Sequence, residues 1–302
     1  MAKLNRTKKI KRTTGDTILE LVTSFILIMI IVIVGYPVAY VVSASISSAT
    51  ALQAGRVIFL PVEPNFDGYN FVLHYKQVWI GYRNTIFYTV TGTMLKVFLQ
   101  VLCAYPISRP SFKARSVYTK VLLITMLVHA GLVPTFLIKT SMGMYDTVWA
   151  IILSGAVSAH NVFILRTAFR SSIPQDLFDA AAIDGANEFD CLWKIAVPLA
   201  KATISVITLY AIVGCWNEYF TAMIYLRNEN LFPLQLFLRT ILTSSKSMDV
   251  SDMDASSQMQ AQNAAEQIRY ALIVISTVPV LVAYGVVQKY FKTGVMIGSV
   301  KG

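Results

Sequence analysis

The chain has 302 residues, of which 55% are hydrophobic and 14% charged, with a mean hydropathy of +0.58. This composition excludes an ordinary soluble domain. The formal net charge is +10, so the few charged residues are biased toward bases. Together these values predict a membrane protein, in which apolar segments of about 20 residues cross the hydrocarbon core.

The N-terminal tail, residues 1–17, holds a cluster of basic residues next to an apolar run. A basic tail beside a membrane span anchors its orientation and contacts anionic membrane lipid, so we favour this role over binding to nucleic acid. The apolar run exceeds the 7–15 residues of a signal-peptide core, which predicts a first helix that is not cleaved. The rest of the chain, 18–302, is expected to form one transmembrane domain.

Six apolar segments follow one another, and each is long enough to span a bilayer. We therefore predict an all-α polytopic membrane protein with six transmembrane helices. Interruptions by His129-Ala130-Gly131 and Pro134 make the boundaries of the third and fourth spans the least sharp. The expected spans are 18–43, 84–107, 119–139, 146–166, 201–225 and 269–291.

The lysines and arginines fall mainly on one side of these six spans. Seventeen lie in the two termini and the 2–3 and 4–5 loops, against eight in the other loops, although those include the two longest. The positive-inside rule then places both termini and the 4–5 loop in the cytoplasm. The long loops 44–83 and 226–268 lie on the opposite face, where they either receive a binding protein or serve only as connections.

Residues 172–199, between the fourth and fifth spans, are called the acidic loop here. Five acids and no base occupy 175–190, which favours a basic partner surface. Either of the two serines before Pro174 can cap a first helix that has this proline in its first turn. Asp184-Gly185 should end that helix, and a second one from about 187 to 195 should stop before Pro198.

The residue spacing in this loop resembles the EAA loop of ATP-binding-cassette importer permeases. An acid precedes two alanines, a glycine follows four positions after the second alanine, an isoleucine ten positions later, and a proline three after that. The residues that carry the match or lie within it are Asp179, Ala180, Ala181, Asp184, Gly185, Ala186, Ile195 and Pro198. The resemblance implies the type I ABC importer permease fold, with cytoplasmic coupling helices between helices four and five.

Two further segments resemble the carbohydrate-uptake branch of this family. Trp216-Asn217-Glu218-Tyr219 follows the tryptophan-asparagine-acid-aromatic pattern of its fifth core helix, and the terminus 294–302 is similar to its tail. Overall the chain looks nearest to permeases for complex or modified oligosaccharides. A permease for a peptide, an osmolyte or phosphate shares the loop chemistry, and only these two segments argue against it.

The resemblance also implies a role for each residue of the acidic loop. Asp179, where the family usually has glutamate, would accept hydrogen bonds from an ATPase groove, and Ala180 and Ala181 would give a close fit. Gly185 would permit the bend between the two helices. Ile195 and Pro198 would fix the second helix against the membrane core.

The same resemblance implies the partners. These are a second permease subunit, usually a different chain, two ATP-binding-cassette ATPase subunits and an extracytoplasmic solute-binding protein. The chain has no Walker lysine motif, nucleophile elbow or metal-ligand spacing among its cysteines and histidines. We therefore expect no cofactor on this chain and no enzymatic activity of its own, with ATP and Mg²⁺ bound by the partner ATPases.

Ionisable residues within the spans are candidates for the substrate pathway, because exposure of such groups to lipid is costly. Lys96 lies in the second span and Glu218 in the outer part of the fifth. Near Glu218, aromatic side chains can stack on sugar rings and an amide can form hydrogen bonds with them; these residues are Tyr210, Trp216, Tyr219 and Asn217. A basic residue facing the pathway suits an acidic sugar. Each residue has a structural alternative, an internal ion pair or a snorkelled side chain for Lys96 and an interhelical hydrogen bond for Glu218.

Two other classes of membrane protein fit the sequence less well. A secondary transporter should show internal repeats and paired ionisable groups at the bilayer midplane, and Lys96 alone gives little support. A membrane-embedded enzyme needs a cluster of catalytic groups, and none is visible in the sequence.

Overall fold

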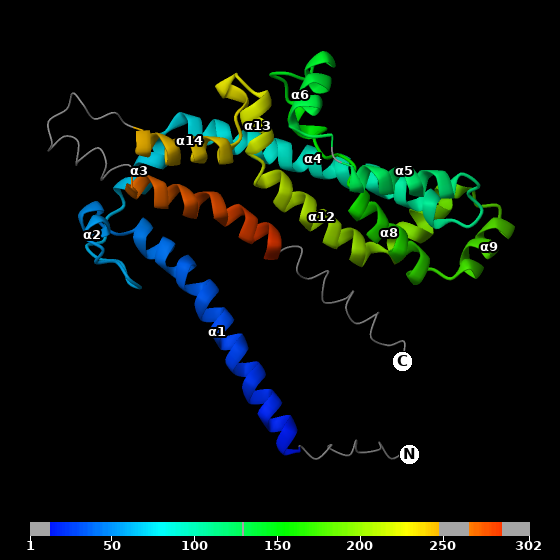
Figure 1. The fold of residues 1–302 in the computed structure, drawn as a ribbon, viewed down its shortest axis with the longest axis horizontal. Coiled ribbons are helices and arrows are strands. Elements are labelled where there is room, and N and C mark those ends of the chain that lie inside the picture. The colour runs from blue at the N-terminus through cyan, green and yellow to red at the C-terminus, as the bar shows by residue number, and fades with distance from the viewer. Residues whose placement is uncertain (1–12, 129, 248–265, 286–302) are drawn as a thin grey trace. The chain divides into compact units, whose positions relative to one another are not determined.

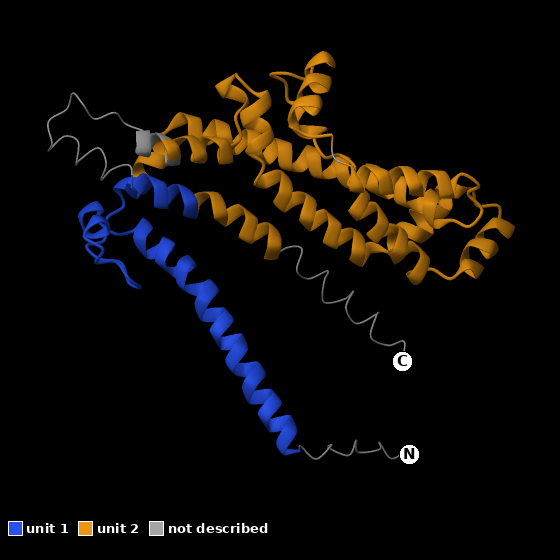
Figure 2. Cartoon of the chain, viewed as in Figure 1, with its two compact units in different colours: residues 1–69, 253–274 blue, residues 70–252, 275–302 orange. Residues whose placement is uncertain are grey.

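A computed structural model describes residues 13–128, 130–247 and 266–285 of the chain. Within these ranges all regular structure is helical and no strand occurs, which confirms the all-α prediction (Figure 1). The basic tail and the terminus 294–302 lie outside the described residues. The chain divides into two compact units, 1–69 with 253–274 and 70–252 with 275–302 (Figure 2).

The first unit contains the long helix α1 (Thr14–Ser45) and the short helix α2 (Ala49–Gln53). Thr13 caps α1, and a reciprocal bond from its backbone N–H to Asp16 completes a capping box. The most apolar stretch of α1 buries none of its residues within this chain. Such a helix is stable only where lipid or another protein surrounds it.

The far end of α1 enters a small core. Ala44 packs there with the residues of α2 and with Val57, and the ring of Tyr40 meets Tyr270 edge to face at 6.0 Å. Tyr270 belongs to the helix Glu266–Gly285. The Gln267 amide donates to the Ser47 carbonyl at 2.8 Å, so residues 220 positions apart are joined by a buried bond.

The second unit is built around α4 (Lys76–Ser108), a helix of 33 residues. It packs against α12 (Lys201–Trp216), α8 (Ala159–Ser172) and α14 (Leu234–Ser247). The cytoplasmic end expected for α4 meets α8 and the acidic loop in a core whose fully buried members include Ala104, Ile107 and Leu165. This core positions the candidate site.

Three helices in the described part of the chain are each long and apolar enough to cross a membrane: α1, α4 and Glu266–Gly285. The third expected span consists of α5 (Arg115–Leu127) and α6 (Leu132–Ser141), which pass the same test only as a bent pair. Gly131, with φ of 81°, lies just before α6. The interruption that the sequence predicts therefore falls between α5 and α6.

The structure divides the fourth expected span, 146–166, instead of continuing it as one helix. A single turn, α7 (Trp149–Ile152), is followed by a bend at Gly155 and then by α8. Gly155 has φ of 63°, a conformation that ends a right-handed helix. The fifth expected span, 201–225, is likewise α12, a break at Asn217–Tyr219 and then α13 (Phe220–Tyr225).

Candidate functional site

The acidic loop begins with α9 (Gln175–Ile183), and its start differs from the prediction. Pro174 occupies the N-cap position with extended backbone, while the two serines expected to cap the helix form the last turn of α8. The physical reason is that Ile173 is buried and extended, which separates the two helices one residue before the proline. Pro174 therefore precedes α9 instead of lying in its first turn.

The turn after α9 confirms the predicted helix break. Asp184 ends the helix, and Gly185 adopts φ of 80°, which glycine reaches without steric cost. The Ala186 N–H then donates to the Ala181 carbonyl at 2.9 Å, which closes the turn. The two arms of the loop thus meet at a fixed glycine hinge.

The second arm is helical from Glu188 to Leu199, longer than predicted. Asn187 caps it by accepting the Asp190 N–H at 2.9 Å. Three short segments follow without a gap: α10 (Glu188–Asp190), a π-helical turn (Cys191–Ala196) and α11 (Val197–Leu199).

The expectation that this helix stops before Pro198 is wrong. Val197 has helical angles, φ of −61° and ψ of −48°, and the helix continues through the proline. A proline ring normally clashes with the carbonyl four residues earlier, but the wider π turn shifts hydrogen bonding to i→i+5. The helix therefore runs one residue past the proline, to Leu199, before the chain bends by 82° into α12.

One face of the loop packs on the membrane domain. Phe178, Cys191 and Leu192 are buried in the core that α4 and α8 also enter. Ala181, Ala186 and Ile195, three members of the sequence motif, are half-buried against that core. Pro198, expected to help fix the second arm there, is exposed instead.

The opposite face of the loop is exposed and mixes acids with apolar groups. Asp179, Ala180, Asp184 and Gly185 all lie on this surface. Ile183 is 88% exposed and Phe189 is 71% exposed, the two highest values among the large apolar side chains of the loop. Ile183 is the most exposed large hydrophobic residue in the described part of the chain, and such an apolar group rimmed by charge is typical of a protein contact.

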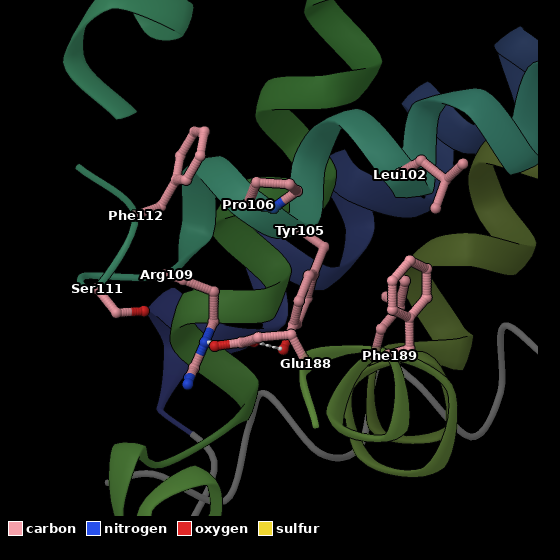
Figure 3. Close-up of a pocket in the computed structure, with 9 residues that line it drawn as sticks. Leu102, Tyr105, Pro106, Arg109, Ser111, Phe112, Glu188 and Phe189 are labelled. Atoms are coloured by element: carbon pink, nitrogen blue, oxygen red, sulfur yellow. Dashed lines mark hydrogen bonds and ion pairs between the residues drawn. The ribbon is translucent and has the colours of Figure 1, made fainter. Parts of the chain in front are cut away.

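Arg109, which follows the last turn of α4, contacts both arms of this loop. Figure 3 shows its side chain beside Glu188 of the second arm. Its guanidinium lies 3.7 Å from the centre of the Phe178 ring in the first arm. Its Nε is 3.6 Å from Glu188 Oε2 in the second arm, and the Tyr105 hydroxyl donates to the same oxygen at 2.6 Å. Arg109 is buried whereas the Glu188 side chain is 60% exposed.

A pocket of about 580 Å³ opens beside this network. Its wall combines the end of α4 with the start of the second arm, and the Glu188 carboxylate and the Arg109 guanidinium lie close together at one side (Figure 3). The remaining lining is mostly apolar. The lining residues are Leu102, Tyr105, Pro106, Arg109, Ser111, Phe112, Glu188, Phe189 and Leu192.

The network of Arg109, Tyr105, Phe178 and Glu188 is not visible in the sequence as a site. Glu188 contributes only to the count of acids, and Arg109 only to the count of loop bases. The α4-side residues and their loop partners lie 69 to 83 positions apart, beyond the i,i+4 range at which a sequence reveals contacts. The signal that identifies this network is a buried arginine next to an exposed acidic helix, and it becomes visible only in the folded structure.

The candidate pathway residues do not form one cluster of side chains. Lys96 is half-buried on α4 and makes no hydrogen bond or ion pair with any residue that the structure describes. Tyr210, on α12, is 59% exposed. Of the structural alternatives for Lys96, an internal ion pair is therefore not found among those residues.

Most of the remaining pathway candidates lie at the break between α12 and α13, where their polar groups bond to nearby protein groups. Trp216 is 5% exposed, and its indole N–H donates to the Ser276 carbonyl at 3.0 Å. The Asn217 amide donates to the Val213 carbonyl at 3.0 Å, and the Glu218 carboxylate accepts the Thr221 N–H, in the first turn of α13, at 2.9 Å. Tyr219 remains half exposed, with the Arg239 guanidinium 4.9 Å from its ring centre.

Residues 85–296 match a family described as "Binding-protein-dependent transport system inner membrane component". The chain is 35% identical to the polygalacturonan/rhamnogalacturonan transport system permease protein YtcP of Bacillus subtilis (strain 168), over 91% of this chain and 96% of YtcP. It is 34% identical to the protein LplC of the same organism, over 88% and 89% of the two chains.

A solved structure is similar over nearly the whole length. It is the crystal structure of a bacterial ABC transporter involved in the import of the acidic polysaccharide alginate. The TM-score is 0.83 at 37% sequence identity, and the match covers 94% of this chain and 100% of that one.

Proposed function

The chain belongs to the family of binding-protein-dependent transport system inner membrane components, and we propose that it forms half of the pathway of an ATP-driven importer for acidic oligosaccharides. It is a transport subunit of the cytoplasmic membrane and not an enzyme. The observation that carries the proposal is the acidic loop, which displays acids and an 88% exposed Ile183 on a helical pair fixed to the membrane core.

Two relatives support an acidic substrate. YtcP is a permease for polygalacturonan/rhamnogalacturonan, and the solved transporter is involved in the import of alginate, an acidic polysaccharide. In this chain, Lys96 supplies a cation within α4 that has no ion pair in the described part of the chain. We assign Lys96 to recognition of the substrate carboxylate, and Tyr210 and Tyr219, both exposed, to stacking on sugar rings.

The acidic loop is assigned to docking on the ATPase. Asp179 and Asp184 are exposed acids beside the projecting Ile183, a surface that suits a groove with a basic rim. Gly185 holds the bend, and the half-buried Ala181 and Ile195 attach the loop to the core. ATP and Mg²⁺ belong to the ATPase in this assignment, and hydrolysis there moves the loop.

The complete importer in this proposal contains a second, different permease, two ATPase subunits and a solute-binding protein. The exposed apolar surface of α1 (Thr14–Ser45) is available to lipid or to the second permease. The charge bias places both termini and the acidic loop in the cytoplasm. The basic tail 1–17 is then cytoplasmic, and 18–302 forms the permease domain with six crossings.

Copurification and uptake test this proposal together. The chain, expressed with its companion subunits and purified in mild detergent, should retain an ATPase. Reconstituted in vesicles, the complex should import oligogalacturonate when the binding protein and internal ATP are present. Recovery without an ATPase, or import of neutral oligosaccharides in preference to acidic ones, would contradict it.

The Lys96→Gln variant tests the recognition of charge. Uptake of an acidic oligosaccharide should fall more than uptake of a neutral one of equal length, because only the acidic substrate loses an ionic partner. Lys120→Gln, in the exposed part of α5, is the matched control and should leave both rates unchanged. Equal losses for the two substrates in Lys96→Gln would remove Lys96 from recognition.

A further inference from the structure

The geometry at the end of α4 points to Arg109 as a clamp that sets the angle between the two arms of the acidic loop and ties both to α4. We propose that this guanidinium transmits movement of the docked loop to the membrane domain. The inference rests on the proposed docking of the acidic loop on an ATPase. It adds a positioning residue that lies outside the loop and its sequence motif.

The first arm is held through two contacts. The Arg109 guanidinium stacks 3.7 Å above the centre of the Phe178 ring, and Phe178 is buried in the core. Arg109 Nη1 also approaches the Gln175 side-chain oxygen at 3.4 Å. The Gln175 amide in turn donates to Asp179 at 2.9 Å, so a short chain of bonds links Arg109 to an acid on the docking face.

The second arm is held through Glu188, the first residue of α10. Its Oε2 lies 3.6 Å from Arg109 Nε and accepts the Tyr105 hydroxyl at 2.6 Å. Arg109 Nε has no hydrogen-bond partner within 3.5 Å among the residues described. The Glu188 carboxylate is therefore the anion that pairs with the buried Arg109 guanidinium. Burial of an unpaired guanidinium is costly, which ties the position of Glu188 to that of Arg109.

Tyr105, four residues earlier on α4, also contacts both arms, since its ring centre lies 6.4 Å from that of Phe178 and its hydroxyl donates to Glu188. Of these two side chains, Arg109 is the one that brings a charge to the contact. The arms meet at Gly185, where φ is 80° and the Ala186 N–H closes the turn onto the Ala181 carbonyl at 2.9 Å. Arg109 adds to this backbone turn a side-chain contact with each arm from the end of α4. Since α4 is 33 residues long, a shift at its end is carried along a rigid element through the bilayer.

Arg109→Gln tests the clamp in the complete transporter with its binding protein. Transport per ATP hydrolysed should fall at least about threefold, the scale on which single residues change coupling between sites. Lys113→Gln removes the same charge from the same loop and should leave the ratio unchanged, because Lys113 is exposed and makes no hydrogen bond or ion pair with a described residue. An unchanged ratio in Arg109→Gln would overturn the proposal.

Hydrogen exchange of the purified complex distinguishes a clamp from a general loss of stability. Arg109→Gln should raise amide exchange in both α9 and α10 while exchange in α12 stays constant. Gln175→Ala should raise it in the first arm alone and Glu188→Gln in the second alone, and both of these residues are exposed, so these variants fold. A rise in only one arm for Arg109→Gln, or a rise throughout the chain, would overturn the clamp.

The double variant Arg109→Gln/Glu188→Gln completes the test. If both residues act through one contact, its loss in transport per ATP equals that of the worse single variant. Full additivity contradicts a shared role. If the wild-type complex does not retain an ATPase, the proposed function is contradicted. The hydrogen-exchange comparison of α9 and α10 still decides, independently, whether Arg109 holds both arms.

Discussion

Single residues define the acidic loop, and Gly185 is the one with the clearest physical requirement. Its φ of 80° lies in the left-handed region, which costs other L-residues roughly 1–2 kcal/mol. A Cβ added there would meet no atom within 4 Å. Backbone conformation, and not space, therefore selects glycine at this position.

Gly185→Val should weaken coupling through backbone strain alone. A strain of about 1 to 2 kcal/mol shifts the population of the observed turn by roughly five- to thirtyfold, and ATP hydrolysis stimulated by the binding protein and substrate should fall. Asparagine tolerates the left-handed region, so Gly185→Asn should retain most of the stimulation. Equal activity of the valine variant and the wild type would remove Gly185 from the coupling role.

Glu63, in the loop that follows α2, offers a pH test at a residue outside the membrane spans. The Ser48 hydroxyl donates to its carboxylate at 2.7 Å and Arg56 pairs with it at 3.0 Å, and together they hold the pKa of Glu63 below its usual value. A carboxyl with a depressed pKa stabilises the fold above its unfolded pKa and loses that contribution as the pH falls through the folded pKa.

Glu63→Gln should therefore raise amide exchange in the surrounding loop at pH 7 relative to the wild type. The difference should shrink as the pH falls through the lowered pKa of Glu63, since protonation then removes the charge from the wild-type side chain as well. Hydrogen exchange of residues 46–63 in both proteins at each pH measures this. A difference that stays constant across the range would show that the charge of Glu63 contributes nothing.

At the scale of elements, α4 organises the second unit because small and polar residues on it admit close neighbours. Gly81 faces the backbone of Leu234 at the start of α14, where an added Cβ would lie 3.1 Å from the Leu234 Cα. Nearby, the Thr85 hydroxyl accepts the Leu234 N–H at 2.8 Å. The loop before α14 is thereby fixed to the outer half expected for α4.

Gly81→Ala should lower the melting temperature of the purified protein. The new methyl group overlaps a backbone that cannot move aside cheaply, at a cost of about 1–3 kcal/mol. Gly214→Ala in α12 is the matched control, since nothing lies within 4 Å of its added Cβ and alanine favours the helix by about 1 kcal/mol. If Gly81→Ala melts at the same temperature as Gly214→Ala, the close approach at Gly81 does not limit stability.

At the scale of the whole molecule, the crossing pattern is less regular than six straight helices. Three described helices are each long and apolar enough to cross alone, whereas α5 with α6, and the helical segment Glu188–Leu199 with α12, pass the same test only as bent pairs. The fourth expected span is divided at Gly155. Breaks of this kind leave backbone groups that only protein or water can satisfy. They are expected inside a multi-subunit channel and not at a lipid surface.

Reporter fusions test the orientation that charge counting predicts. Alkaline phosphatase joined after Asn228 should be active outside the cytoplasm of a bacterial host, and the same enzyme joined after Asp184 should be inactive. Green fluorescent protein joined after Gly302 should fluoresce. Active phosphatase at Asp184 would reverse the assigned topology and separate the acidic loop from any cytoplasmic ATPase.

The sequence alone determined the class of the molecule, because composition and charge bias are properties that folding does not alter. The all-α membrane fold, the importer family and the break at Gly185 were predicted from hydropathy, motif spacing and the conformational freedom of glycine, and the structure or the relatives confirm them. Each of these predictions depends only on residues that are close together in the sequence.

Only the tertiary structure decided which residues meet across long separations. Sequence gave no reason to join Arg109 to Phe178 and Glu188, to bury Trp216 against Ser276, or to continue the second arm through Pro198. Each outcome depends on packing between segments far apart in the chain, and packing overrides local preference where it buries a charge or a ring. The acidic loop is recognisable from its own residues, but its attachment to α4 is a property of the fold.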